Sequence, residues 1–230
     1  MIQKIATLLL LTFFFIPCNA KNGLIKKIND DTFTIVGTVG GSFCFGDIGG
    51  SSSEQELLGL NDLVFPNIQY MVSIGFRTMF SDRWGVKLSF FNTPAKSIDK
   101  SSRNNDRRFE LNARILGLDA QAEYYFWKTI NNQHQSSTYL FSGIGVANSQ
   151  IKFKGDPRPD DSYKSKATTP FIPIGIGYNY QLERFLLGAE LGVKYMFSDY
   201  IDGVTTKYSK QNDVISYFTF SVSYRILQGR

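Results

Sequence analysis

The stretch Pro170–Ser198 constrains the fold of this chain more than any other. Over 172–182 every second residue is apolar or aromatic, and small or polar residues lie between them. The same alternation resumes after Glu183 and Arg184 and continues over 185–197. A period of two is typical of a β-strand whose faces meet different environments, and two such runs across a short polar turn predict a hairpin.

The length of these two runs indicates a membrane. Each reaches the roughly 9–11 residues that a tilted strand needs to cross a bilayer, whereas an ordinary strand has about 5–6. The apolar faces begin or end in aromatic residues such as Tyr180, Phe185 and Phe197, which is typical of a membrane–water boundary. A lone hairpin would leave unpaired backbone groups in lipid. The rest of the chain must therefore supply enough strands to close a barrel.

Alternating runs elsewhere supply these strands. In the fourth run the apolar set shifts by one residue at Ile115–Leu116, which predicts a β-bulge there. The phase of the fifth run is ambiguous in LFSGIGVA. The eight predicted strands are 33–45, 68–80, 84–91, 109–126, 139–153, 172–182, 185–197 and 217–226.

The connections alternate in length, which is a second signal. Outer-membrane barrels have short periplasmic turns and long extracellular loops. We therefore predict an all-β, eight-stranded antiparallel up-and-down transmembrane β-barrel of the outer-membrane type, with both termini periplasmic. The short connections are 81–83, 128–137 and 183–184, and the long ones are 47–66, 92–106, 155–169 and 200–211.

Residues 1–20 read as a signal peptide, with Lys4, an apolar stretch and a small-x-small site at Cys18–Ala20. A lipid on Cys18 is the less favoured alternative, because proline is a poor residue at the position directly before a lipidated cysteine, which Pro17 occupies. We predict a periplasmic tail over 21–32, a barrel domain over 33–227 and a location in the Gram-negative outer membrane. Cleavage leaves Cys44 as a single cysteine, predicted to be a small interior packing residue.

The inward positions carry charges of both signs. The lumen of an eight-stranded barrel is just wide enough for side chains, and buried charges must be paired. The sequence therefore predicts a salt-bridged plug, with a proton or ion path as the alternative. The predicted interior network is Arg77, Lys87, Glu110, Arg114, Asp119, Glu123, Glu190, Lys194 and Arg225.

No residues suggest catalysis, a metal site, a cofactor or a small-molecule substrate. Barrel hydrolases generally need a histidine beside a nucleophile, and the single histidine, His134, falls in a predicted short connection. One histidine also makes no convincing zinc site. The net charge of +5 does not imply nucleic acid in a secreted barrel, so we predict a non-catalytic protein.

The two predicted rims suggest partners. The basic loop residues Arg103, Arg107 and Arg108 are candidates for contact with lipopolysaccharide phosphates in the surrounding outer-membrane lipid. On the periplasmic side, Lys26, Lys27 and Lys128 form a candidate docking rim for a protein of complementary charge.

Four stretches carry a family resemblance: SDRWGVKLSF, LFSGIGVANS, PFIPIGIGYNYQL and MFSDYIDGVTTKY. The chain resembles the PorG-type outer-membrane barrels of the type IX secretion system over most of its mature length. The resemblance implies an accessory component that contacts the periplasmic ring proteins of the secretion machine. The alternative is a small surface-exposed barrel like OmpX or OmpA, acting as an adhesin or an envelope-integrity protein.

Overall fold

The structure is a computed structural model that describes residues 33–45, 68–98, 110–131, 134–154, 162–182, 184–198, 200–201, 204–205 and 212–226. Its strands are β1 (Thr34–Phe45), β2 (Gln69–Met79), β3 (Trp84–Ile98), β4 (Glu110–Asn131), β5 (His134–Lys154), β6 (Ser162–Tyr163), β7 (Lys166–Leu182), β8 (Phe185–Met196), β9 (Val204–Thr205) and β10 (Val214–Arg225). The short strands β6 and β9 pair only with each other in a small separate sheet.

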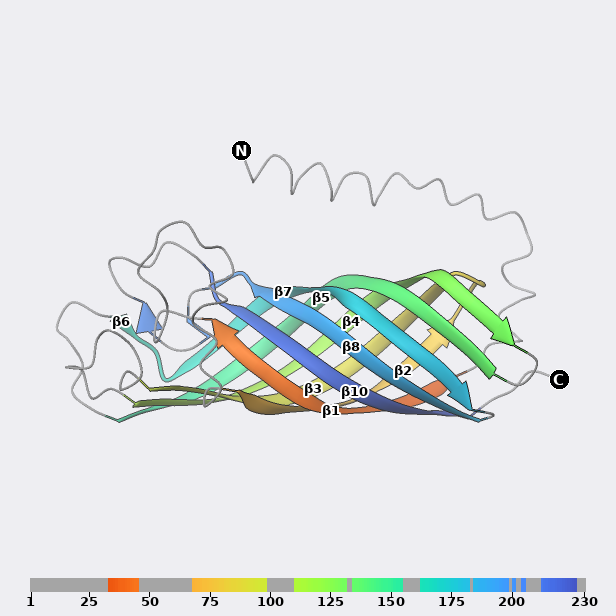
Figure 1. Cartoon of the computed structure of the whole chain (residues 1–230). Helices are drawn as coiled ribbons and strands as arrows, with labels where there is room; N and C mark the ends of the chain where they lie inside the picture. The colour runs from red at the N-terminus through yellow and green to blue at the C-terminus, as the bar shows by residue number, and fades with distance from the viewer. Residues whose placement is uncertain are drawn as a thin grey trace, which may run out of the picture.

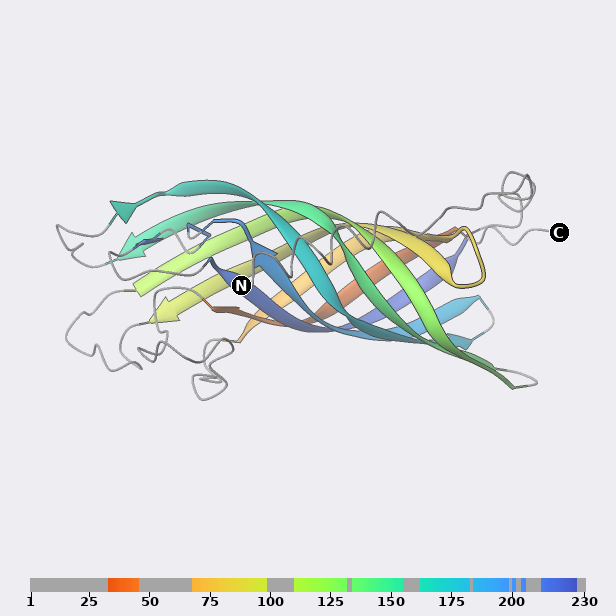
Figure 2. The ribbon, with the colours of Figure 1, turned by 90° about the horizontal axis from the view of Figure 1, so that it is seen from above.

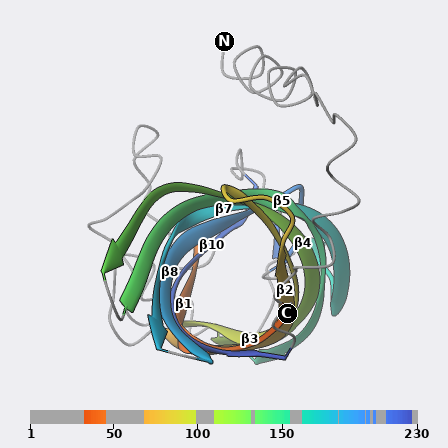
Figure 3. The same cartoon turned by 90° about the vertical axis from the view of Figure 1, so that its right-hand side faces the viewer.

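The other eight strands form a closed barrel in the order β1-β10-β8-β7-β5-β4-β3-β2 (Figure 1). All neighbouring pairs are antiparallel, and the barrel closes between β1 and β10, from Thr34 opposite Arg225 to Phe45 opposite Val214. Seen end-on, the strands make a continuous ring (Figure 3). Closure pairs the backbone groups that an open sheet would expose to lipid. The predicted eight-stranded antiparallel barrel is therefore confirmed.

Both ends of the barrel chain lie at the same end of the barrel. The backbone N–H of Ile226 donates to the carbonyl oxygen of Phe33 at 2.8 Å. The tight turn at 80–83 and the turn at Arg184 lie at this end too. We call it the short-turn end, and the opposite end the long-loop end.

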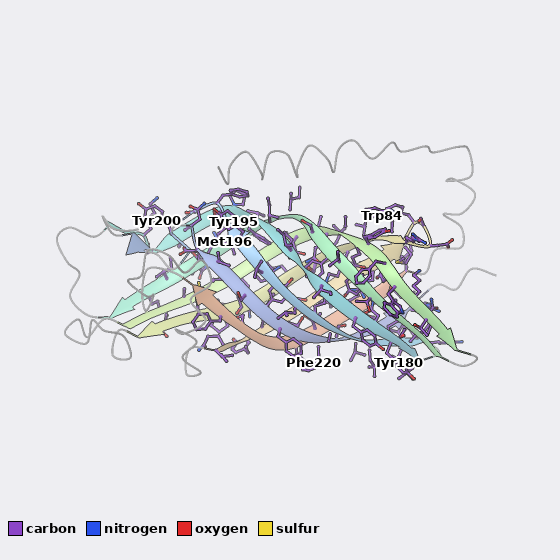
Figure 4. All side chains as sticks on the ribbon, turned by 45° about the horizontal axis from the view of Figure 1, so that its top comes forward. Trp84, Tyr180, Tyr195, Met196, Tyr200 and Phe220 are labelled. Atoms are coloured by element: carbon purple, nitrogen blue, oxygen red, sulfur yellow. The ribbon has the colours of Figure 1, made fainter. Side chains whose placement is uncertain are left out.

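The outer surface of the barrel is an apolar belt. Its large side chains are widely exposed, with Leu191 at 57%, which suits a surface that faces lipid rather than water. Aromatic residues lie toward both margins, with Trp84 and Tyr180 toward the short-turn end, Tyr195 toward the other, and Phe220 between them (Figure 4). The belt includes Val39, Ile74, Leu88, Leu118, Ile144, Ile174, Leu191, Phe220 and Val222.

Four adjacent strands are longer than the rest. β3, β4, β5 and β7 have 15, 22, 21 and 17 residues, and they lie side by side in the barrel. They extend past their shorter neighbours at the long-loop end, as Figure 2 shows. The predicted loop 92–106 is therefore wrong at its start, because β3 continues to Ile98. Above the belt an outward side chain meets water, so the strand no longer needs the apolar alternation that sequence reading relied on.

The predicted connection 128–137 is also mostly strand. β4 continues to Asn131 and β5 begins at His134, with Asn131 opposite His134 in the ladder. The polar residues of this stretch lie beyond the belt, where polar outward positions are compatible with a strand.

The predicted bulge at Ile115–Leu116 is wrong. The ladder between β4 and β5 is continuous there and shifts instead between Tyr125 and Trp127. Ile115 is buried inside the barrel, whereas the neighbouring Arg114 is exposed. The apolar residues change face because the surroundings reverse: the belt is apolar outside, whereas the projecting part is apolar inside, like a water-soluble barrel.

This projecting part has its own apolar core. Phe91, Ala95, Ala113, Ile115, Ile151, Phe171, Met196, Ile201 and Ile215 are buried in it. Nearer the short-turn end, aromatic rings of β5 lie over glycines of β7: a side chain added at Gly177 would collide with the ring of Tyr139. Cys44 is half-buried and packs against the core.

Candidate functional site

Glu190 of β8 is the centre of an ion-pair network inside the barrel. Its side chain is buried, and Lys87 Nζ donates to both carboxylate oxygens, at 2.6 and 2.7 Å. Arg77 Nη2 donates to Glu190 Oε1 at 3.1 Å, and the Tyr139 hydroxyl donates to the same oxygen at 2.7 Å. Two cations and a phenol from three strands therefore converge on one carboxylate.

Arg77 links this carboxylate to a second one. Its Nε donates to Glu123 Oε1 at 3.0 Å, and the Tyr125 hydroxyl donates to Glu123 Oε2 at 2.7 Å. Arg77 Nη1 also donates to Asn179 Oδ1 at 3.4 Å. The guanidinium thus joins β2 to β4, β7 and β8 across the lumen.

A separate pair lies closer to the long-loop end. Lys194 Nζ donates to Asp119 Oδ2 at 2.7 Å, and Ser89 Oγ donates to Asp119 Oδ1 at 2.6 Å. The Lys194 ammonium also lies 4.2 Å from the ring centroid of Phe91 and 4.9 Å from that of Phe171. Aromatic faces and a carboxylate together compensate the burial of this cation.

The structure brings together most of the predicted interior residues. Arg225 is half-buried near the short-turn end, where its Nη2 donates to Gln181 Oε1 at 3.0 Å. The side chain of Glu110 lies outside the described part. The residues that form the paired interior groups are Arg77, Lys87, Asp119, Glu123, Glu190 and Lys194.

The prediction for Arg114 is wrong, and sequence reading missed Tyr125 and Tyr139. Arg114 lies on the outer face with its Nε 3.4 Å from Asn92 Oδ1, because its strand keeps one phase through Ile115. The sequence did not place Tyr139 inside the barrel because the phase of its strand was ambiguous. The glycines at 175 and 177, inward on the neighbouring strand, were the available signal that large rings face them.

These side chains close the lumen. A cavity of about 10 Å³ lies among them, lined by residues that include Lys87, Gln121, Glu190 and Lys194. A cavity of this size has room for at most one water molecule. The middle of the barrel is thus filled by side chains.

A larger polar cavity opens at the short-turn end, and we call it the vestibule. Its volume is about 210 Å³. Two donor groups in its wall have no hydrogen-bond partner among the described residues: Asn179 Nδ2 and Arg225 Nε. The vestibule is lined by Thr34, Arg77, Met79, Ser81, Asp82, Tyr125, Lys128, Gln135, Ser137, Asn179, Gln181, Leu186 and Arg225.

Lys128 belongs to this wall and lies in β4, not in a connection as the sequence suggested. Its Nζ donates to the backbone oxygen of Asp82 and lies 5.3 Å from the ring centroid of Tyr125. The pKa of Lys128 is lowered from its ordinary value, chiefly because partial burial desolvates the ammonium group. The carboxylate of Asp82 opposes this shift, and the guanidinium of Arg83 adds to it. The other predicted rim residues, Lys26, Lys27, Arg103, Arg107 and Arg108, lie outside the described residues.

The outer face of the projecting strands is basic, and we call its residues Arg114, Lys152 and Lys166 the basic row. All three are exposed. Gln150 of β5 lies opposite Arg114 on one side and opposite Lys166 on the other. These cations therefore lie close together, just beyond the apolar belt.

Over the described ranges, no cluster of three or more His, Cys, Asp or Glu side chains is placed to hold a metal ion. The same ranges contain no helix with the length and apolarity to cross a membrane. His134, as the first residue of β5, lies at the short-turn end.

Several solved outer-membrane proteins are similar to this chain. Neisserial surface protein A is 10% identical, with a TM-score of 0.49 over 85% of this chain and 99% of that one. A major outer membrane protein of Thermus thermophilus is 11% identical, with a TM-score of 0.46 over 85% and 99%. The attachment invasion locus protein Ail of Yersinia pestis, in complex with sucrose octasulfate, is 14% identical, with a TM-score of 0.42 over 85% and 98%.

None of the curated proteins matches this sequence. A family model does match, over residues 24–221, and this range includes nearly all of the barrel described above. The chain folds into a closed eight-stranded β-barrel, and it belongs to the family described as Domain of unknown function (DUF6089).

Proposed function

We propose that this protein is a non-catalytic docking component of the type IX secretion machinery in the Gram-negative outer membrane, reached after cleavage of residues 1–20. The observation that carries the proposal is the filled lumen. With ion pairs such as Lys87–Glu190 across the barrel, transport through it has no path, and the two rims are left as working surfaces. The PorG-type resemblance supports a ring partner at the short-turn end, taken as periplasmic.

The docking rim gives the first test. Lys26, Lys27 and Lys128 are reversed to Glu, and co-purification with the periplasmic ring is measured together with retention of secreted cargo. Complementary charge steers association, so we expect weaker, salt-sensitive recovery of the ring and cargo held in the cell. Heat-modifiable migration on a denaturing gel checks that the variant folds. This check is needed because Lys128 lies in β4, so its reversal could disturb the barrel.

A matched control comes from the opposite end. The basic row is neutralised with Arg114→Gln, Lys152→Gln and Lys166→Gln. These residues are exposed on the outer face, so the barrel should fold and ring recovery should be unchanged. Normal ring recovery and secretion from a correctly folded docking-rim variant would rule out this rim as the contact.

The basic row favours a second candidate function, that of an envelope-integrity barrel anchored in lipopolysaccharide. Arg and Lys side chains bind phosphate through charge-assisted hydrogen bonds, and the row lies just beyond the belt, at the level of headgroups. We expect the neutralised basic-row variant to retain less lipopolysaccharide after purification than wild type, with a weaker barrier against detergents. Equal lipopolysaccharide content in both proteins would remove this candidate.

A further inference from the structure

We propose that the vestibule binds the carboxylate of an extended, acidic peptide segment. The charged residues of its wall favour such a ligand. Lys128 and Arg225 bring cations to the wall, whereas Asp82 is the acid in the described lining. Arg77 also lines the vestibule, but its charge is paired with Glu123 and Glu190. The wall is therefore suited to a ligand that accepts hydrogen bonds and carries negative charge.

Two donor groups of the wall, Asn179 Nδ2 and Arg225 Nε, also favour an acceptor as ligand. Asn179 is 2% exposed, and its Nδ2 has no hydrogen-bond partner in the described part of the chain, although its Oδ1 accepts from Arg77. Arg225 Nε is unpartnered in the same part, although Nη2 is held by Gln181. A buried donor without a partner is costly, so these groups are available to an acceptor that enters the vestibule. Both can only donate, which selects an acceptor such as a carboxylate oxygen.

An uncovered strand edge beside the vestibule favours a peptide over a free anion. β4 pairs with β3 as far as Tyr124 opposite Trp84, and the Tyr125 N–H then donates to Arg83. Beyond the bulge β4 continues from Trp127 to Asn131, paired with β5 on its other side. Among the described residues no strand covers the β3 side of this extension. An extended peptide can add to such an edge by backbone hydrogen bonds and direct one acidic side chain into the adjoining vestibule.

This inference rests on the proposed function only for the periplasmic orientation of the short-turn end. It is tested on the purified, folded full-length barrel in detergent micelles. The probe is an acetylated and amidated pentapeptide, Thr-Val-Glu-Val-Thr, and its matched control replaces the central glutamate with glutamine. Binding is followed by isothermal titration calorimetry at low and high salt. The assay contains no secretion component, so its failure is distinct from a failure of ring docking.

We expect the glutamate peptide to bind and the glutamine peptide to bind at least about tenfold more weakly, as the loss of a charge-assisted hydrogen bond predicts. Arg225→Gln and Asn179→Asp should each weaken the glutamate peptide by a similar factor. Arg184→Gln is the control, because this exposed turn residue at the same end does not line the vestibule.

The inference is overturned by equal binding of the two peptides, by no detectable binding of the glutamate peptide, or by wild-type affinity in the Arg225 variant. Acetate is titrated in the same way to test whether a free anion is enough. If acetate binds as tightly as the glutamate peptide, the ligand is a small carboxylate and the peptide assignment is wrong. If Asn179→Asp does not fold, Arg225→Gln and the paired peptides still decide.

Discussion

Among single residues, Glu190 is the carboxylate that two buried cations share. It accepts from Lys87, Arg77 and Tyr139, which come from three different strands. These groups are buried, so removal of the carboxylate leaves two cations without their shared partner. Lys87 then loses the carboxylate that it pairs with, whereas Arg77 keeps Glu123, so the loss of Glu190 should be strongly destabilising.

We predict that Glu190→Ala lowers the free energy of unfolding by about 3–5 kcal/mol, the usual cost of removing one partner of a buried ion pair. Urea unfolding in detergent micelles, followed by heat-modifiable migration, measures the change. Arg184→Gln, in an exposed turn, should stay within about 0.5 kcal/mol of wild type. Wild-type stability of the Glu190 variant would mean that the network contributes little to the fold.

Gly177 shows how the same network depends on a residue without a side chain. A Cβ there would strike the ring of Tyr139, whose hydroxyl holds Glu190. We predict that Gly177→Ala costs about 1–3 kcal/mol through overpacking. Gly37→Ala is the matched control, because the nearest atom to its Cβ would be Val222 O at 3.9 Å. Similar unfolding curves for the two variants would contradict the ring-over-glycine packing.

At the scale of elements, the long strands each have two parts with opposite polarity. Leu118 of β4 is exposed in the belt, whereas Arg114 is exposed beyond it and Ile115 is buried between. The strand keeps its phase while its surroundings change from lipid to water. The same substitution should therefore have different costs in the two parts of the outer face.

We predict that Leu191→Arg, on the lipid face of β8, costs about 2–4 kcal/mol near the bilayer midplane. Thr168→Arg, on the exposed outer face of β7 beyond the belt, should change stability by about 0.5 kcal/mol or less. Both are measured by unfolding from lipid vesicles. Equal costs would place the membrane boundary elsewhere on the barrel.

At the scale of the whole molecule, the barrel is a closed wall around a filled lumen, with an open vestibule at one end and a projecting sheet at the other. The cavity near Lys87, Glu190 and Lys194 measures only about 10 Å³. The wall holds the two ends of the barrel on opposite sides of the apolar belt.

We predict that the pure protein gives no steady conductance in a planar bilayer. The lumen has no continuous water path, because the interior of a barrel of this size is filled by side chains. A wide porin in the same lipid is the positive control. Stable open-channel currents from the wild-type protein would contradict the closed lumen and the proposed docking role that depends on it.

The sequence by itself determined the strands of the belt and, except in β5, the facing of their residues. Within lipid every outward side chain must be apolar and every backbone group must be paired, so the alternation around Leu191 and Phe220 is fixed locally. That requirement also predicted inward charges such as Arg77 and Glu190. It ends where the strands leave the membrane, and for that reason the extent of β3 and β5 and the facing of Arg114 were not predictable.

Only the tertiary structure decided which charges meet. Lys87 and Glu190 are 103 residues apart in the chain, and their contact across the lumen depends on the register of every strand between them. The bulge after Tyr125, the hydroxyl of Tyr139 against Glu190 and the vestibule around Asn179 depend on it in the same way. Pairing across a closed barrel is set by the sum of its registers, which no local stretch of sequence contains.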